Sequence, residues 1–139
     1  MKPTRCAVIE QWGLADLAWH LADHVDDDAA RAWAWIERGD VQQDQGDLAA
    51  ALGSYRASLA IRERLAAADR GNAGWQRDVA VSNAKLGAAC LANQDPAQAR
   101  HFLLAGRAIM AGLVARYPDW VEWKRDLAWV DGQLAALVP

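Results

Sequence analysis

The sequence predicts an all-α protein in which about six helices stack as antiparallel hairpins into a right-handed superhelix. Three observations support this fold class. The segment Trp75–Asp78 (Trp-Gln-Arg-Asp) returns 48 positions later as Trp123–Asp126 (Trp-Lys-Arg-Asp). Apolar residues recur over long segments at the three-and-four spacing of amphipathic helices. Small residues such as Gly39 and Ala51 recur with the same period. Small side chains at such positions allow the backbones of two paired helices to approach closely.

The offset of 48 residues also aligns many positions outside the motif. The matching pairs are Asp47 and Asp95, Ala49 and Ala97, Ala51 and Ala99, Ala57 and Ala105, Ile61 and Ile109, Leu65 and Leu113, and Leu86 and Leu134. A fixed period of this length is typical of stacked-repeat proteins. A single hairpin cannot bury its apolar face alone, so neighbouring hairpins must pack together.

Composition bounds the functional classes. A chain of 139 residues forms one domain, residues 1–139, with a sizeable core. A net charge of -3 without a basic block lacks the electrostatic footprint of a nucleic-acid-binding protein. No apolar run approaches the roughly 18 residues of a membrane helix. Cys6 and Cys90 lie far apart without metal-ligand spacing, so we expect free thiols and a cytoplasmic location.

The first element is expected at residues 5–25, as an N-terminal capping helix. An apolar stripe marks its buried face: Leu14, Leu17, Ala18, Leu21 and Val25. The acidic triplet at 26–28 then has two interpretations, a cation site or a helix N-cap. We favour the N-cap, because carboxylates stabilise the positive end of a helix.

The first repeat is expected at residues 29–74. It has a helix over about 29–43, a turn ending in the capping residue Asp47, and a long helix over about 48–69. Three consecutive charged residues, Arg62, Glu63 and Arg64, are expected on the solvent face of the long helix. The loop 71–74 is expected to close that helix with a left-handed glycine.

The second repeat is expected at residues 75–119 and has the same plan. Its first helix runs from Trp75 to about residue 92, and its second is expected to begin with Asp95 as N-cap and Pro96 at the first helical position. That second helix extends to Arg116. A last helix over about 120–137 forms a C-terminal half-repeat, residues 120–138.

These hairpins resemble the tetratricopeptide repeat. Its pattern of a small residue, an alanine, an aromatic and a second small residue is matched by Gly39, Ala51, Tyr55 and Ser58 in the first copy and by Gly87, Ala99, Leu103 and Gly106 in the second. The period of 48, the Trp-x-Arg-Asp step and the Gln-Gly-Asp turn are similar to the elongated, kinesin-light-chain-like repeats of bacterial proteins. In the repeated motif, we expect the indole to pack under the preceding long helix and the Arg and Asp to tie the loop or an adjacent repeat.

The resemblance implies a concave groove lined by the first helices of the hairpins, and hence a protein or peptide partner. The implied groove residues are Trp33, Ile36, Asp40, Gln43, Asp44, Val81, Ala84, Ala88, Leu91 and Trp129, with Gly132 and Ala136 further along the last helix. They are apolar with acid at one end. Lys85 and Asn83 alone do not form the family's clamp for a terminal carboxylate. A partner with apolar anchors, such as a helix laid in the groove, is therefore expected.

Two other functions fit parts of the sequence. Apolar residues on more than one face of the last helix favour a homodimer with Trp129 near its centre. Asp16, His20 and His24 share one helical face and could hold a metal. That face lacks the glutamate of a His-Glu-x-x-His zinc helix, so we expect a solvated polar face instead, with no metal, cofactor or enzyme activity.

Overall fold

The computed structural model describes residues 27–137, which form five helices in this part of the chain: α2 (Asp28–Asp44), α3 (Leu48–Ala68), α4 (Ala73–Ala92), α5 (Pro96–Arg116) and α6 (Val121–Ala136). No strand occurs among these residues. The all-α prediction is therefore confirmed. The helix expected at residues 5–25, with Cys6 and the face of Asp16, His20 and His24, lies outside the described residues.

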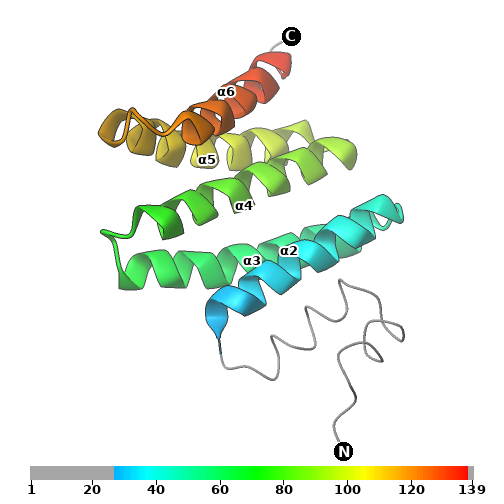
Figure 1. Ribbon diagram of the computed structural model, residues 1–139. Helices are drawn as coiled ribbons and strands as arrows, with labels where there is room; N and C mark the ends of the chain where they lie inside the picture. Colours follow the sequence, from blue (N-terminus) through cyan, green and yellow to red (C-terminus); the bar gives the residue numbers. More distant parts are fainter. Residues whose placement is uncertain (1–26, 138–139) are drawn as a thin grey trace, which may run out of the picture.

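The helices pack as successive hairpins, which Figure 1 shows stacked from α2 at one end to α6 at the other. The main contacts join α2 to α3 and α4 to α5 within hairpins, and α3 to α4 and α5 to α6 between them. Among the described helices none is long and apolar enough to cross a membrane.

Aspartates begin three of the helices, as the sequence predicts. The carboxylate of Asp27 accepts hydrogen bonds from the amides of Ala29 and Ala30, at 2.9 and 3.2 Å. Asp47 and Asp95 cap α3 and α5 in the same way. These bonds satisfy backbone donors that the first turn of a helix leaves free. The acidic triplet thus contains an N-cap, as expected.

The turns within the two hairpins have the same backbone geometry. Gly46 and Gln94, which the 48-residue offset aligns, are the two described residues with positive φ, 81° and 58°. In each turn the following aspartate amide donates to a carbonyl five residues earlier, at 2.9 Å. The prediction of a left-handed glycine in the loop 71–74 is wrong, because neither glycine of this loop has a positive φ. Asn72 instead caps α4 by accepting from the amide of Trp75 at 3.0 Å, so this helix begins before Trp75.

Close backbone contacts hold each hairpin together. A Cβ added to Gly39 would lie 2.5 Å from the ring of Tyr55, and one added to Gly87 would lie 2.6 Å from the side chain of Leu103. These pairs occupy equivalent positions in the two hairpins. The missing Cβ at each glycine therefore leaves the space that a bulky side chain from the second helix fills.

The buried side chains form two core clusters. One cluster of buried side chains joins α2, α3 and α4, and a second joins α4, α5 and α6. Arg62, which the sequence places on the solvent face, is half-buried between α3 and α4. Its guanidinium donates to the hydroxyl of Ser82 at 2.8 Å and to the carbonyl of Asp78 at 3.2 Å. That expectation was wrong for Arg62, whereas Glu63 and Arg64 are exposed as predicted.

Candidate functional site

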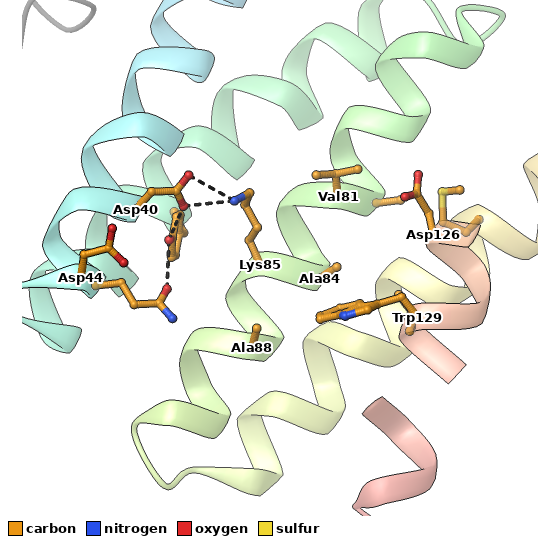
Figure 2. A pocket seen from close by; sticks show the side chains of 13 residues that line it. Asp40, Asp44, Val81, Ala84, Lys85, Ala88, Asp126 and Trp129 are labelled. Carbon is orange, nitrogen blue, oxygen red and sulfur yellow. Dashed lines mark hydrogen bonds and ion pairs between the residues drawn. The ribbon is translucent and has the colours of Figure 1, made fainter. Parts of the chain in front are cut away.

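A concave groove of about 570 Å³ crosses α4 between α2 and α6. Figure 2 shows acidic side chains from α2 at one side, small side chains from α4 along the floor, and an indole from α6 at the other side. The residues that line it are Asp40, Gln43, Asp44, Tyr55, Ala80, Val81, Ala84, Lys85, Ala88, Met110, Asp126, Trp129 and Val130.

The floor is made by successive turns of α4. Val81, Ala84 and Ala88 recur at the spacing that places side chains on one helical face. All three are half-buried. Because the two alanines end at Cβ, they leave space above the helix that larger residues would fill.

The acidic side of the groove is organised around Asp40. The ammonium of Lys85 lies 3.0 Å from one carboxylate oxygen of Asp40 and 3.3 Å from the other. The phenol of Tyr55 donates to Asp40 at 2.6 Å and also lies 3.0 Å from the side-chain oxygen of Gln43. Burial, and then the hydrogen bond to Asp40, raise the pKa of Tyr55 above its ordinary value. The phenol is therefore a stable donor at neutral pH, and it fixes the orientation of Asp40.

Asp44 lies one turn after Asp40 on α2, and it is exposed. No residue of the described part of the chain forms an ion pair with it. It is the last residue of α2, whose final turn contains no basic side chain. The groove therefore has one carboxylate that no side chain in the described part of the chain neutralises.

The opposite side of the groove is apolar. Trp129 is 46% exposed, although it lies beside the buried Val130 on α6. Asp126 lines the same side, but its carboxylate accepts hydrogen bonds from Nε and Nη2 of Arg77, at 3.0 and 2.9 Å. An indole with nearly half its surface in water, beside a floor of small residues, is an available site for an apolar side chain.

Arg77 and Asp126 also explain the repeated motif. Arg77 belongs to the first Trp-x-Arg-Asp copy and Asp126 to the second, so their ion pair joins α4 to α6. Trp75 packs against the core cluster that includes residues of α3, and Trp123 is buried beside α5. The expected packing of the indole against the preceding long helix is confirmed for Trp75 and Trp123. The expected tie to the loop or an adjacent repeat is confirmed for Arg77 and Asp126, which join adjacent repeats.

Seven of the ten groove residues expected from the sequence line the cavity: Asp40, Gln43, Asp44, Val81, Ala84, Ala88 and Trp129. Ile36 does not, because it is 5% exposed and packs in the core with Tyr55. Leu91 is half-buried and lies outside the lining. Trp33 is 52% exposed and also lies outside the cavity. It occupies the position that the repeat aligns with Val81 and Trp129.

Sequence reasoning missed the residues that close the bottom of the groove and the cation that bridges its acidic side. Tyr55 and Met110 reach the cavity from α3 and α5, behind the first helices of the hairpins. The sequence indicates Lys85 only as part of an incomplete carboxylate clamp. A signal for it was present, since its charge is opposite to that of the nearby acidic end. Its pairing with Asp40 depends on how α2 and α4 are packed, which the sequence does not state.

Comparison with protein-family models, with curated proteins and with solved structures gives no match to this chain. The groove and the chemistry of its lining are therefore the features that bear on function.

Two further features bear on whether this part of the chain holds a chemical site. Within residues 27–137 no group of three His, Cys, Asp or Glu side chains is placed to hold a metal ion. Cys90 is buried, and burial raises the pKa of its thiol, which disfavours the reactive thiolate. His20 and His24 lie outside the described residues, so the structure does not bear on the metal face considered from the sequence.

Proposed function

We propose that this chain is a protein–protein interaction module of tetratricopeptide-repeat type that binds a partner segment in the groove between α2 and α6. The observation that carries the proposal is the half-exposed Trp129 beside a floor of small residues in a cavity of about 570 Å³. Ligand sites are typically concave and mostly apolar, with a few well-placed polar groups, and this groove has that composition.

Two ion pairs that join α4 to α2 and to α6 support a preformed site. Lys85 of α4 binds Asp40 of α2, and Arg77 of α4 binds Asp126 of α6. The helix α4 is therefore tied to both α2 and α6, which favours a fixed separation between the two sides of the groove. A preformed groove binds a segment without losing conformational entropy of its own side chains and backbone.

A phage-displayed library of random peptides, panned on the purified chain, tests this function. Ala84→Arg places a long side chain over the floor, at a half-buried position where it can reach solvent. We expect selected peptides to bind the wild-type chain and to lose binding to Ala84→Arg, whose helical circular dichroism should be unchanged. Peptides that bind both proteins equally, or no selected peptide at all, would contradict the proposal.

A homodimer through α6 is the second candidate, favoured by the exposure of Trp129 and Val121, at 46% and 58%. Trp129 cannot lie at the centre of a dimer and remain open to a partner in the groove, so the two functions compete. Sedimentation at micromolar concentration separates them. A dimer that Trp129→Glu converts to a monomer of 15.2 kDa supports self-association, whereas a wild-type monomer excludes it.

A further inference from the structure

The charges of the groove specify its partner more closely than its shape does. Three carboxylates line the cavity, from Asp40, Asp44 and Asp126, against one ammonium, from Lys85. Arg77 neutralises Asp126 from outside the lining, and Lys85 neutralises Asp40. Asp44 has no ion-pair partner among residues 27–137, so this part of the chain leaves one negative charge uncompensated at the α2 side of the groove.

The end of α2 adds to this negative potential. A helix C-terminus carries the partial negative charge of its unpaired carbonyl groups, which cations near the last turn stabilise. The last turn of α2 contains Asp44 and no basic residue. Within the described residues, the fold therefore places a carboxylate where a lysine or arginine would be favourable, and no basic side chain of that last turn offsets it.

The remaining surface of the groove accepts an apolar side chain. Ala84 and Ala88 form a shallow floor, and Trp129 stands over its α6 side in Figure 2. The nearby Asp126 is already held by Arg77 at 2.9 Å, so it does not require a second cation. The acidic and the apolar sides of the groove are thus separate, on opposite sides of α4.

Building on the function proposed above, we infer that the partner is a basic segment. Its lysine or arginine pairs with Asp44, and a bulky apolar side chain packs against Trp129. An acidic segment fits less well, because the one cation in the lining, Lys85, already lies 3.0 Å from Asp40. A second copy of this chain also fits less well, since each copy carries a net charge of -3.

The peptides selected by phage display give the probes, as fluorescein-labelled synthetic copies measured by fluorescence anisotropy. We expect them to contain a lysine or arginine, and substitution of that residue by glutamine should weaken binding roughly five- to tenfold. Asp44→Asn should weaken binding of the original peptide by a similar factor. For the Asp44→Asn variant, the peptide with glutamine should bind almost as tightly as the original peptide, because the ion pair is already absent. Added salt should weaken the wild-type complex, because exposed ion pairs are screened.

Asp119→Asn is the matched control, since Asp119 is exposed in the turn before α6 and lies outside the groove lining. It removes the same charge from the chain and should leave the affinity unchanged. Equal losses in Asp44→Asn and Asp119→Asn would overturn the inference, because only overall charge would then matter.

Two other outcomes distinguish this inference from the function on which it rests. Selected peptides that require an open groove, as judged by Ala84→Arg, but bind Asp44→Asn normally would overturn the basic partner and leave the binding function intact. Peptides that bind Ala84→Arg as tightly as the wild-type chain would overturn both the basic partner and the proposed binding function of the groove. Trp129→Ala should weaken binding of the selected peptides whether or not their basic residue is present, because its contact is apolar.

Discussion

Arg77 and Asp126 join the two copies of one sequence motif across 49 residues, through two hydrogen bonds to a single carboxylate oxygen. The arginine of the first copy meets the aspartate of the second because α4 and α6 occupy equivalent places in successive hairpins. The two copies of the motif thus supply the two side chains of the ion pair that connects them. Internal similarity in the sequence is expressed in the fold as a contact between neighbouring repeats.

A double-mutant cycle measures this connection. Arg77→Ala and Asp126→Ala should each lower the free energy of unfolding, and the double variant should lose less than the sum. The coupling should be about 0.5–1 kcal/mol, because both side chains are about one-third exposed and solvent screens them. Arg125→Ala is the control, since Arg125 is the matching arginine of the second copy and is exposed. Additive effects of Arg77→Ala and Asp126→Ala in urea unfolding would contradict the coupling.

The turn at Gln94 can be improved by substitution. Gln94 has a positive φ of 58°, in the region where side chains are strained, and its equivalent in the first hairpin is Gly46. Gln94→Gly should therefore stabilise the chain by roughly 0.5–1 kcal/mol, after the greater freedom of glycine in the unfolded chain is counted. Gly46→Ala should destabilise it by about 1 kcal/mol. A lower melting temperature for Gln94→Gly would show that its side chain stabilises the turn.

Much of the fold is predictable from local sequence. Asp47, Asp95 and Pro96 begin their helices at the expected places, because capping depends on residues a few positions apart. The groove residues Asp40, Asp44 and Trp129 follow from the repeat alignment combined with the family resemblance. These features need no knowledge of how distant segments meet.

The sequence-based predictions are wrong where side-chain length and helix packing determine whether a residue is buried or exposed. Ile36 and Ala84 are aligned by the repeat, yet Ile36 is buried in the core and Ala84 lines the groove. The longer side chain of Ile36 reaches the cluster around Tyr55, whereas the alanine methyl remains on the floor. Arg62 was misplaced for a similar reason, since its partner Ser82 lies on another helix. Sequence periodicity identifies a helical face but not the depth to which each side chain extends.

The small residues within the hairpins should be intolerant of enlargement. Gly39→Ala places a Cβ 2.5 Å from the ring of Tyr55, so the ring or the helix must move. We expect a loss of about 1–2 kcal/mol, although alanine favours the helix. Gly53→Ala is the matched control, because its added Cβ meets no atom within 4 Å and should stabilise α3 by about 0.5–1 kcal/mol. Similar melting temperatures for the two variants would disprove the close contact.

Larger substitutions at the alanines of the hairpin interface extend this test. Ala51 and Ala99 are fully buried at equivalent positions of α3 and α5. Replacement of either by leucine should overpack the interface and cost roughly 1–3 kcal/mol. Ala60→Leu, at an exposed position of α3, should change stability little. Unchanged unfolding curves for both buried sites would contradict the hairpin packing described above.

Tyr55 should make the stability of the folded protein decrease at alkaline pH. Its pKa is raised in the folded state, so folding favours the protonated phenol. This contribution to stability is fully present below the pKa of an unfolded tyrosine, about 10, and is lost as pH rises toward the folded value. At neutral pH, Tyr55→Phe should cost about 1 kcal/mol through loss of the bond to Asp40. The difference between the two proteins should shrink above about pH 10. A constant difference between pH 8 and pH 11 would contradict this linkage.

Asp44 should contribute to binding at a cost to stability. Its carboxylate lies in the last turn of α2, where a negative charge is unfavourable with respect to the helix dipole. Asp44→Asn should therefore raise the free energy of unfolding by a few tenths of a kcal/mol, and Asp44→Lys should raise it further, while both weaken the binding of basic peptides. Asp28→Asn, at the opposite end of the same helix, should have the opposite effect on stability, because a carboxylate is favourable there. Guanidinium chloride screens these charges, so urea unfolding at low salt is the appropriate measurement. A loss of stability in Asp44→Asn would mean that the carboxylate serves the fold, and the case for its role in partner recognition would weaken.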